Sequence, residues 1–337
     1  MSARRSILPV FVPHMGCPHA CVFCDQRRIS GKRKTVTPED VRALVKQAAA
    51  LPRSGAARQL AFYGGSFTAI PETVQAALLE AGREAMEAGQ VDSLRLSTRP
   101  DAVDERILER LWSFGVRTIE LGAQSMDEEV LRRAGRGHSA KDLRRAARMI
   151  REAGFELILQ MMTGLPGDTL EKSLYTAREL IALEPDGVRI YPTVIVRGTE
   201  LFDLWRRGEY REHTVEEAVN WCARLLPLFE EAGIPVIRLG LNPTEELSGG
   251  EAAAGAYHPA LGELVKSRIL LNRARELLRT VPPGKVKLGV RSSLLSQALG
   301  QHRRNLETLR REFPHLATEI VPVDDAAEDL FFLEQKV

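Results

Sequence analysis

Short runs rich in β-branched and aromatic residues alternate with longer helical patterns through the first two thirds of the chain. Helices open at cap signals such as Thr37-Pro38-Glu39-Asp40 and close at glycines such as Gly115. This order is typical of repeated βα units, whose strands form a parallel sheet. About six units are too few to close an eight-stranded barrel. We predict strands near residues 8–12, 59–63, 93–97, 118–122, 156–161, 187–191 and 236–239.

Three of the four cysteines lie within eight residues, in the segment Gly-Cys-Pro-His-Ala-Cys-Val-Phe-Cys-Asp at 16–25. Thiolates at the spacing of Cys17, Cys21 and Cys24 can surround one inorganic centre from a single loop. Three cysteine ligands leave one iron of a cluster open, and that position suits a small-molecule ligand. The leading interpretation is therefore an iron–sulfur cluster with a catalytic role.

A structural zinc ion and chance clustering in a surface loop are the alternatives. Zinc needs a closed set of four ligands. The fourth would have to be His14, His19 or Cys222, because the chain has no second Cys-x2-Cys pair. Cys222 shares a helical stripe with Val219 and Leu226, which favours a buried core thiol over a ligand.

Polar residues and glycines follow one predicted strand after another. In parallel β/α folds the chemistry belongs at the carboxyl ends of the strands. Paired glycines such as Gly64 and Gly65 let the backbone approach a ligand closely. Any one of these residues could be a strand-end polar group with its hydrogen bonds satisfied within the protein. That explanation does not account for their recurrence at one strand end after another. The segments are 63–67, 97–101, 120–125, 136–138 and 160–167.

The cysteine loop, with Phe23 before its third cysteine, resembles that of the radical S-adenosylmethionine (SAM) superfamily. The segments 97–101, 120–125, 136–138, 161–167, 189–193 and 197–199 closely resemble the catalytic subunit of Elongator, a family that modifies the wobble uridine of tRNA. The resemblance covers about residues 7–241. It implies an α/β fold class, an open, partial β/α barrel of about six units. It also implies an enzyme whose 4Fe–4S cluster, held by the three cysteines, cleaves SAM to a 5′-deoxyadenosyl radical.

The resemblance also suggests roles for single residues. Ser66 stands where the family usually has Glu, so only backbone contacts carry over there. Three of the expected SAM contacts also resemble positions in oxygen-independent coproporphyrinogen oxidases: Gln124, Arg136 and Gln160. The full set of expected SAM contacts is Gly64, Gly65, Ser97, Arg99, Gln124, Arg136 and Gln160. The candidates for catalysis on the substrate side are Tyr191, Glu120 and His138.

Two departures separate the chain from Elongator catalytic subunits. Those proteins continue into an acetyltransferase domain with an acetyl-CoA loop of Gly-x-Gly type, and they carry zinc-binding cysteines between the domains. This chain of 337 residues has neither feature. Use of acetyl-CoA is therefore not carried over.

The last hundred residues follow another pattern. We predict a radical SAM domain at 1–241 and a C-terminal extension at 242–337, with a linker and helix at 242–280. Residues 281–337 read as strand, helix, turn, helix and strand, which resembles the α+β core of a KH-type RNA-binding module. Arg303 replaces the final glycine of the Gly-x-x-Gly turn of that module and makes the turn basic. The alternative is a scaffold extension that closes the barrel.

Composition limits the partners and the compartment. The net charge is only +2, but stretches 132–151 and 281–313 are strongly basic. No signal peptide and no apolar run of about 20 residues is evident, so we expect a cytoplasmic protein with no membrane partner. RNA, in particular tRNA, is the expected substrate, with flavodoxin or ferredoxin as the low-potential electron donor. The alternatives are a radical enzyme acting on a tetrapyrrole and a non-catalytic carrier of a cluster or haem.

Overall fold

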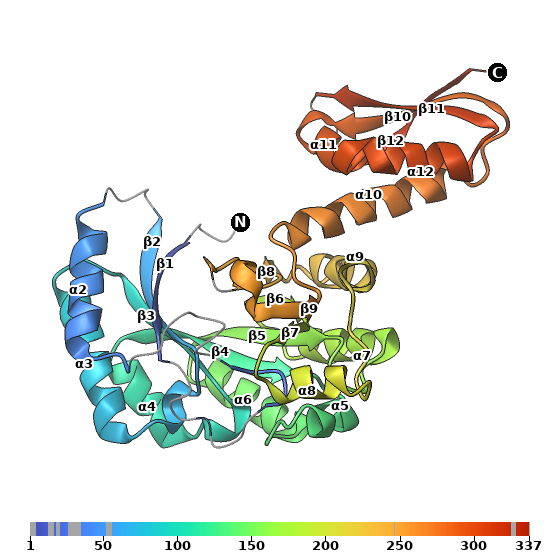
Figure 1. Ribbon diagram of the computed structural model, residues 1–337. Coiled ribbons are helices and arrows are strands. Elements are labelled where there is room, and N and C mark those ends of the chain that lie inside the picture. The colour runs from blue at the N-terminus through green and yellow to red at the C-terminus, as the bar shows by residue number, and fades with distance from the viewer. Residues whose placement is uncertain are drawn as a thin grey trace. The chain divides into compact units, whose positions relative to one another are not determined.

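A computed structural model describes residues 5–12, 17, 21–25, 35–51, 56–245, 247–324 and 328–336 (Figure 1). The chain divides into two compact units. The first contains Met1–Thr214 and Leu228–Tyr257, and the second contains Val215–Pro227 and His258–Val337. The domain boundary after residue 241 remains a prediction.

A seven-stranded parallel sheet forms the frame of the first unit. The spatial order is β1-β2-β3-β4-β5-β6-β8, and every neighbouring pair is parallel. Among the described residues β1 pairs only with β2 and β8 only with β6, so the curled sheet is an open half-barrel. The predicted α/β class and all seven predicted strands are confirmed. Their bounds are β1 Arg5–Phe11, β2 Ala57–Tyr63, β3 Ser93–Thr98, β4 Val116–Gln124, β5 Glu156–Thr163, β6 Gly187–Pro192 and β8 Val236–Leu239.

Helices follow the strands and cover one face of the sheet (Figure 1). The caps explain where they begin: Thr37 and Ser139 each form a capping box with the aspartate three residues later. Strand residues such as Leu60, Leu94 and Ile119 are fully buried. The helices of the first unit are α2 Pro38–Ala49, α3 Glu72–Glu87, α4 Glu105–Ser113, α5 Glu128–Arg133, α6 Ala140–Glu152, α7 Leu170–Ile181 and α8 Glu200–Arg206. Helix α9, Val215–Glu231, is divided between the two units.

The opposite face of the sheet carries polar side chains. Successive strand residues point to opposite faces, so Arg95 and Ser97 face away from the side on which Leu94 and Leu96 lie. The pairing register places Ser97 of β3 beside Glu120 of β4. The concave side of the half-barrel therefore presents polar side chains such as Ser97 and Glu120 among apolar ones such as Ile158.

A small two-stranded sheet was not predicted. The predicted linker at the start of 242–280 contains strand β9 (Ala252–Gly255), which pairs antiparallel with β7 (Val194–Val196). A Cβ at Gly255, where φ is 88°, would lie 2.8 Å from the carbonyl oxygen of Thr193. The small residues thus allow the two strands to pair closely.

The second unit contains a three-stranded sheet in the order β11-β10-β12. Strands β10 and β11 are parallel, and β12 is antiparallel to β10. The predicted order of strand, helix, turn, helix and strand is confirmed; β12 was not predicted. The elements are α10 Leu261–Leu278, β10 Gly284–Arg291, α11 Leu295–Leu299, α12 Arg304–Glu312, β11 Leu316–Val323 and β12 Leu330–Lys336.

The turn between α11 and α12 has an unusual backbone. Gly300, His302 and Arg303 have φ values of 74°, 51° and 61°, in the left-handed region. The four side chains from Gln301 to Arg304 are all exposed. Asn305 ties the start of α12 to α11, because its side-chain amide donates to the carbonyl oxygens of Gln297 and Ala298 at 3.2 and 3.1 Å.

Among the described residues, no helix is both long enough and apolar enough to cross a bilayer.

Candidate functional site

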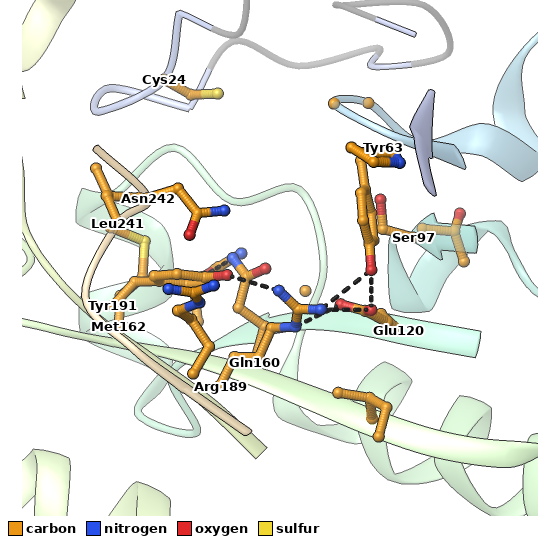
Figure 2. Close-up of a pocket in the computed structure, with 18 of the residues that line it drawn as sticks. Cys24, Tyr63, Ser97, Glu120, Gln160, Met162, Arg189, Tyr191, Leu241 and Asn242 are labelled. Atoms are coloured by element: carbon orange, nitrogen blue, oxygen red, sulfur yellow. Dashed lines mark hydrogen bonds and ion pairs between the residues drawn. The ribbon is translucent and has the colours of Figure 1, made fainter. Parts of the chain in front are cut away.

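A cavity of about 1300 Å³ lies on the concave side of the half-barrel (Figure 2). The lining residues come from all seven strands of the sheet and from the described part of the cysteine loop. Glu120 and Tyr191, two of the three candidates for catalysis, lie in its wall, and His138 does not. Every residue predicted to bind the cluster or SAM also lines it: Cys17, Cys21, Cys24, Gly64, Gly65, Ser97, Arg99, Gln124, Arg136 and Gln160.

Val22 anchors the cysteine loop to the rest of the first unit. Its backbone N–H donates to the carbonyl oxygen of Ala134 at 3.1 Å, and its carbonyl accepts from the N–H of Leu201 at 2.7 Å. Its buried side chain packs against Leu201 and Ile195. Cys21 and Cys24, which flank Val22 and Phe23, are thereby held at the edge of the cavity.

Arg136 joins the loop to the strand ends. Its Nη1 lies 3.3 Å from Cys21 Sγ, and its Nη2 donates to the carbonyl oxygen of Gly122 at 2.6 Å. Positive charge thus stands next to the sulfur of Cys21. For Cys17, burial raises the thiol pKa, while the backbone N–H of Ser66 and the nearby guanidiniums of Arg99 and Arg136 oppose that rise.

The donor set fits an iron–sulfur cluster. Three thiols line one cavity, and soft sulfur ligands from a single loop are the usual set for iron. In the described part of the chain, no three potential ligands already stand together at metal-binding separations. His14 and His19, the candidates for a zinc site, lie outside the described residues. Cys222 is fully buried in α9, and burial raises its pKa to about 12, as expected for a core thiol.

The ends of β2 and β3 are tied together by hydroxyl groups. Gly64 has φ 98°, a conformation that favours glycine. Ser66, at the usual position of the family's glutamate, has its hydroxyl 3.0 Å from that of Thr98 and accepts from the backbone N–H of Arg99 at 3.4 Å. Arg99 forms a forked pair with Asp101 at 2.9 and 2.8 Å. The remaining Nη1 of Arg99 is buried without a partner among the described residues, so it can donate to a ligand.

Two glutamines meet over the end of β4. Gln160 Nε2 donates to Gln124 Oε1 at 3.4 Å, and Gln124 has the rare φ of 64°. A Cβ at Gly122 would lie 2.9 Å from Gln124 Nε2 and 3.3 Å from Arg136 Nη2. The strained backbone and the glycine together let these three polar side chains converge.

A buried network across the barrel was not predicted (Figure 2). Tyr63 donates from its hydroxyl to Glu120 Oε1 at 2.7 Å. Arg189 pairs with both carboxylate oxygens of Glu120 at 3.0 Å and donates to the hydroxyl of Tyr191 at 3.2 Å. Burial and then the charge of Glu120 raise the pKa of Tyr63. The signal in the sequence was a charged residue in the middle of an apolar strand, as in Val188-Arg189-Ile190.

His138 is buried and does not line the cavity. It is only 5% exposed, and neither ring nitrogen has a hydrogen-bond partner among the described residues. Burial, and secondarily the charge of Arg136, lower its pKa to about 4. At neutral pH the ring is therefore an uncharged part of the core.

We expect the His138→Gln variant to lose less stability in acid than the wild type. Between the ordinary pKa of 6.5 and the folded-state value of about 4, the unfolded state takes up a proton that the folded state does not. The contribution of His138 to wild-type stability therefore falls as the pH falls through this window, by roughly 2–3 kcal/mol from pH 7 to 4.5. Asp168, whose pKa is raised by burial to about 6, acts in the opposite direction but equally in both proteins. Urea unfolding at pH 7 and 4.5 measures the difference; equal losses in both proteins would show that His138 is not buried and neutral.

Comparison with known families identifies two matched regions. Residues 11–180, half of the chain, match the Radical SAM superfamily. Residues 185–270 match the Radical_SAM C-terminal domain.

Two relatives match this chain over less than half of their own length. Elongator complex protein 3 of Mus musculus is 28% identical over 226 residues, which are 61% of this chain and 40% of that protein. The tRNA uridine(34) acetyltransferase of Methanocaldococcus infernus is 34% identical over 131 residues, 38% of this chain and 24% of that protein. The chain thus spans less than half the length of either relative. The solved structure of Methanocaldococcus infernus Elp3 with an N-terminal deletion shares the fold, with a TM-score of 0.61 at 23% identity, over 82% of this chain and 63% of that one. On the family match over half of its residues, the chain belongs to the radical SAM superfamily, whose members generally use a 4Fe–4S cluster and SAM.

Proposed function

We propose that Cys17, Cys21 and Cys24 hold a 4Fe–4S cluster and that SAM binds beside it at the strand ends. One observation carries the proposal: the three thiols and every expected SAM contact line the same cavity. When bound and reduced by a low-potential donor such as flavodoxin or ferredoxin, the cluster supplies the electron that cleaves SAM to methionine and a 5′-deoxyadenosyl radical.

The residues of the chain then have separate tasks. Arg136 keeps positive charge beside Cys21 and fixes the end of β4. Gly64 and Gly65 offer backbone groups to the amino end of SAM, and the free Nη1 of Arg99 donates to its carboxylate. The enclosing strands exclude water from the reacting atoms.

We further propose that the substrate is RNA, specifically tRNA. The name of one relative, tRNA uridine(34) acetyltransferase, points to uridine in tRNA. In the second unit, the exposed turn 301–304 presents His302, Arg303 and Arg304. Positive side chains on an exposed turn neutralise phosphates, and this term dominates the affinity for nucleic acid. The turn therefore supplies the backbone contact that an RNA substrate needs.

The double variant Arg303→Glu, Arg304→Glu tests this contact. We expect its dissociation constant for bulk tRNA to rise about tenfold or more, with a shallower salt dependence, because two phosphate contacts become repulsive. Fluorescence anisotropy with the full, cluster-loaded chain measures both quantities.

A matched control carries the same change of charge elsewhere. Lys46 on α2 and Arg106 on α4 are exposed, and Lys46→Glu with Arg106→Glu should leave tRNA affinity within about threefold. Equally weakened tRNA binding in both double variants would mean that the loss of affinity comes from the change in net charge alone. If the wild type binds no RNA at all, the RNA proposal fails, while the radical SAM proposal stands.

A further inference from the structure

Arg95 is a buried cation in the wall of the cavity. It lies on β3 between Leu94 and Leu96, and it is only 3% exposed. Because Leu94 and Leu96 are fully buried on the other face of the strand, the side chain of Arg95 belongs to the concave face, and it lines the cavity there. Nothing in the proposed cluster or SAM contacts uses this side chain.

Arg95 forms no hydrogen bond with any described residue. Its Nη1 is 3.4 Å from Glu120 Oε1 and its Nη2 is 3.8 Å from Glu156 Oε2. Its Nε is buried without a partner in the described part of the chain. A guanidinium has five N–H donors, and burying them without acceptors costs free energy.

The nearby carboxylates are already occupied. Glu120 Oε1 accepts from the hydroxyl of Tyr63 at 2.7 Å and from Arg189 Nη2 at 3.0 Å, so its two lone pairs are used. Glu156 Oε2 accepts from the hydroxyl of Thr118 at 2.5 Å. The two glutamates balance the positive charge of Arg95 without forming hydrogen bonds to it.

The position of Arg95 separates it from the expected SAM contacts. It precedes Ser97 by two residues on the same strand and pairs in register with Thr118 rather than with Glu120. Two strand residues span about 6–7 Å, so the backbone of Arg95 lies that much deeper in the half-barrel than the backbone of Ser97. A ligand on Arg95 can therefore be a second molecule.

We propose that Arg95 anchors a second subsite, deep in the barrel, for a small carboxylate-bearing molecule that binds together with SAM. A carboxylate matches the planar fork of a guanidinium and carries a single negative charge. A phosphate dianion would meet stronger repulsion from Glu120 and Glu156. Ile7 and Ile158 also line the cavity and suit a short aliphatic group. Only the role of this molecule as a co-substrate rests on the proposed function; its binding does not.

Saturation-transfer NMR with the full, cluster-loaded chain tests the subsite, with acetate as the probe and acetamide as its uncharged counterpart. At constant ionic strength we expect a saturable acetate signal that persists when SAM is present, and none from acetamide. Absence of the acetate signal would overturn the proposal. So would an equal acetamide signal, or complete displacement of acetate by SAM, which would assign Arg95 to the carboxylate of SAM. Because no turnover is needed, a failure to form 5′-deoxyadenosine would not affect this result.

Variants locate the signal. Arg95→Gln should lower the apparent affinity for acetate at least about tenfold. Arg95→Lys keeps Glu120 and Glu156 compensated, so it preserves the fold, and it should also weaken acetate binding because it loses the fork. Arg110→Gln is the matched control: Arg110 bonds Gln75 at 2.7 Å and lies outside the residues lining the cavity. Unchanged binding in both Arg95 variants would overturn the assignment.

Discussion

Replacing Cys21 by alanine is expected to abolish iron loading and the formation of 5′-deoxyadenosine. Cys21 is the middle ligand of the three, and its sulfur is the one that Arg136 contacts. Two remaining thiolates cannot hold a four-iron cluster against loss to solvent. Iron analysis after anaerobic reconstitution should give about four irons per wild-type chain and only traces in the variant. Product chromatography should find 5′-deoxyadenosine with the wild type alone.

The fourth cysteine provides the control. Cys222 is fully buried in α9 and does not line the cavity, so Cys222→Ala should keep both iron and activity. It should lose only some stability from the missing packing. Equal iron loss in the Cys222 variant would mean that the cluster has four cysteine ligands. That result would contradict the open iron on which SAM binding depends.

Replacing Glu120 by glutamine is expected to destabilise the fold by about 3–5 kcal/mol. Glu120 is 3% exposed, pairs with Arg189 through both oxygens and accepts from Tyr63. Its removal leaves the buried guanidinium of Arg189 without a counter-charge, and that uncompensated charge dominates the cost. Urea unfolding at neutral pH measures the change.

Two further variants distinguish burial from charge. Glu179 pairs with Arg144 at a half-exposed site, so Glu179→Gln should cost less than about 1 kcal/mol. Removing both partners of the buried pair, with Glu120→Gln and Arg189→Met, should recover part of the loss, because the charge of Arg189 is removed while Arg95 keeps Glu156 as a counter-charge. If Glu120→Gln costs no more than Glu179→Gln, the network is not buried as described.

The sequence predicted the sheet well because the alternation of strand and helix is a local signal. All seven strands of the half-barrel begin and end within a few residues of the predicted positions. The pairing of β7 with β9 was missed because it depends on residues about sixty positions apart, and because Ala252, Ala253 and Ala254 have no strong strand preference. Strand β12 was missed for a similar reason: only its place beside β10 stabilises it.

The candidate site was predicted in part. The strand-end residues carried a recognisable pattern, so the family resemblance could assign them as SAM contacts. All of these contacts line the cavity. Arg95 and Arg189 lie within apolar strands, and the fact that they meet Glu120 depends on the curl of the sheet rather than on neighbours in sequence. His138 follows a residue pattern that suggested the site, yet packing buried it outside the cavity.

The central claim is that the three cysteines and the strand ends form one site for radical SAM chemistry. The most direct test is to reconstitute the chain anaerobically with iron and sulfide, add dithionite and SAM, and measure 5′-deoxyadenosine with and without bulk tRNA. We predict formation of 5′-deoxyadenosine that depends on SAM and reductant and is stimulated by tRNA. A fully loaded cluster that yields no 5′-deoxyadenosine under any of these conditions would contradict the claim.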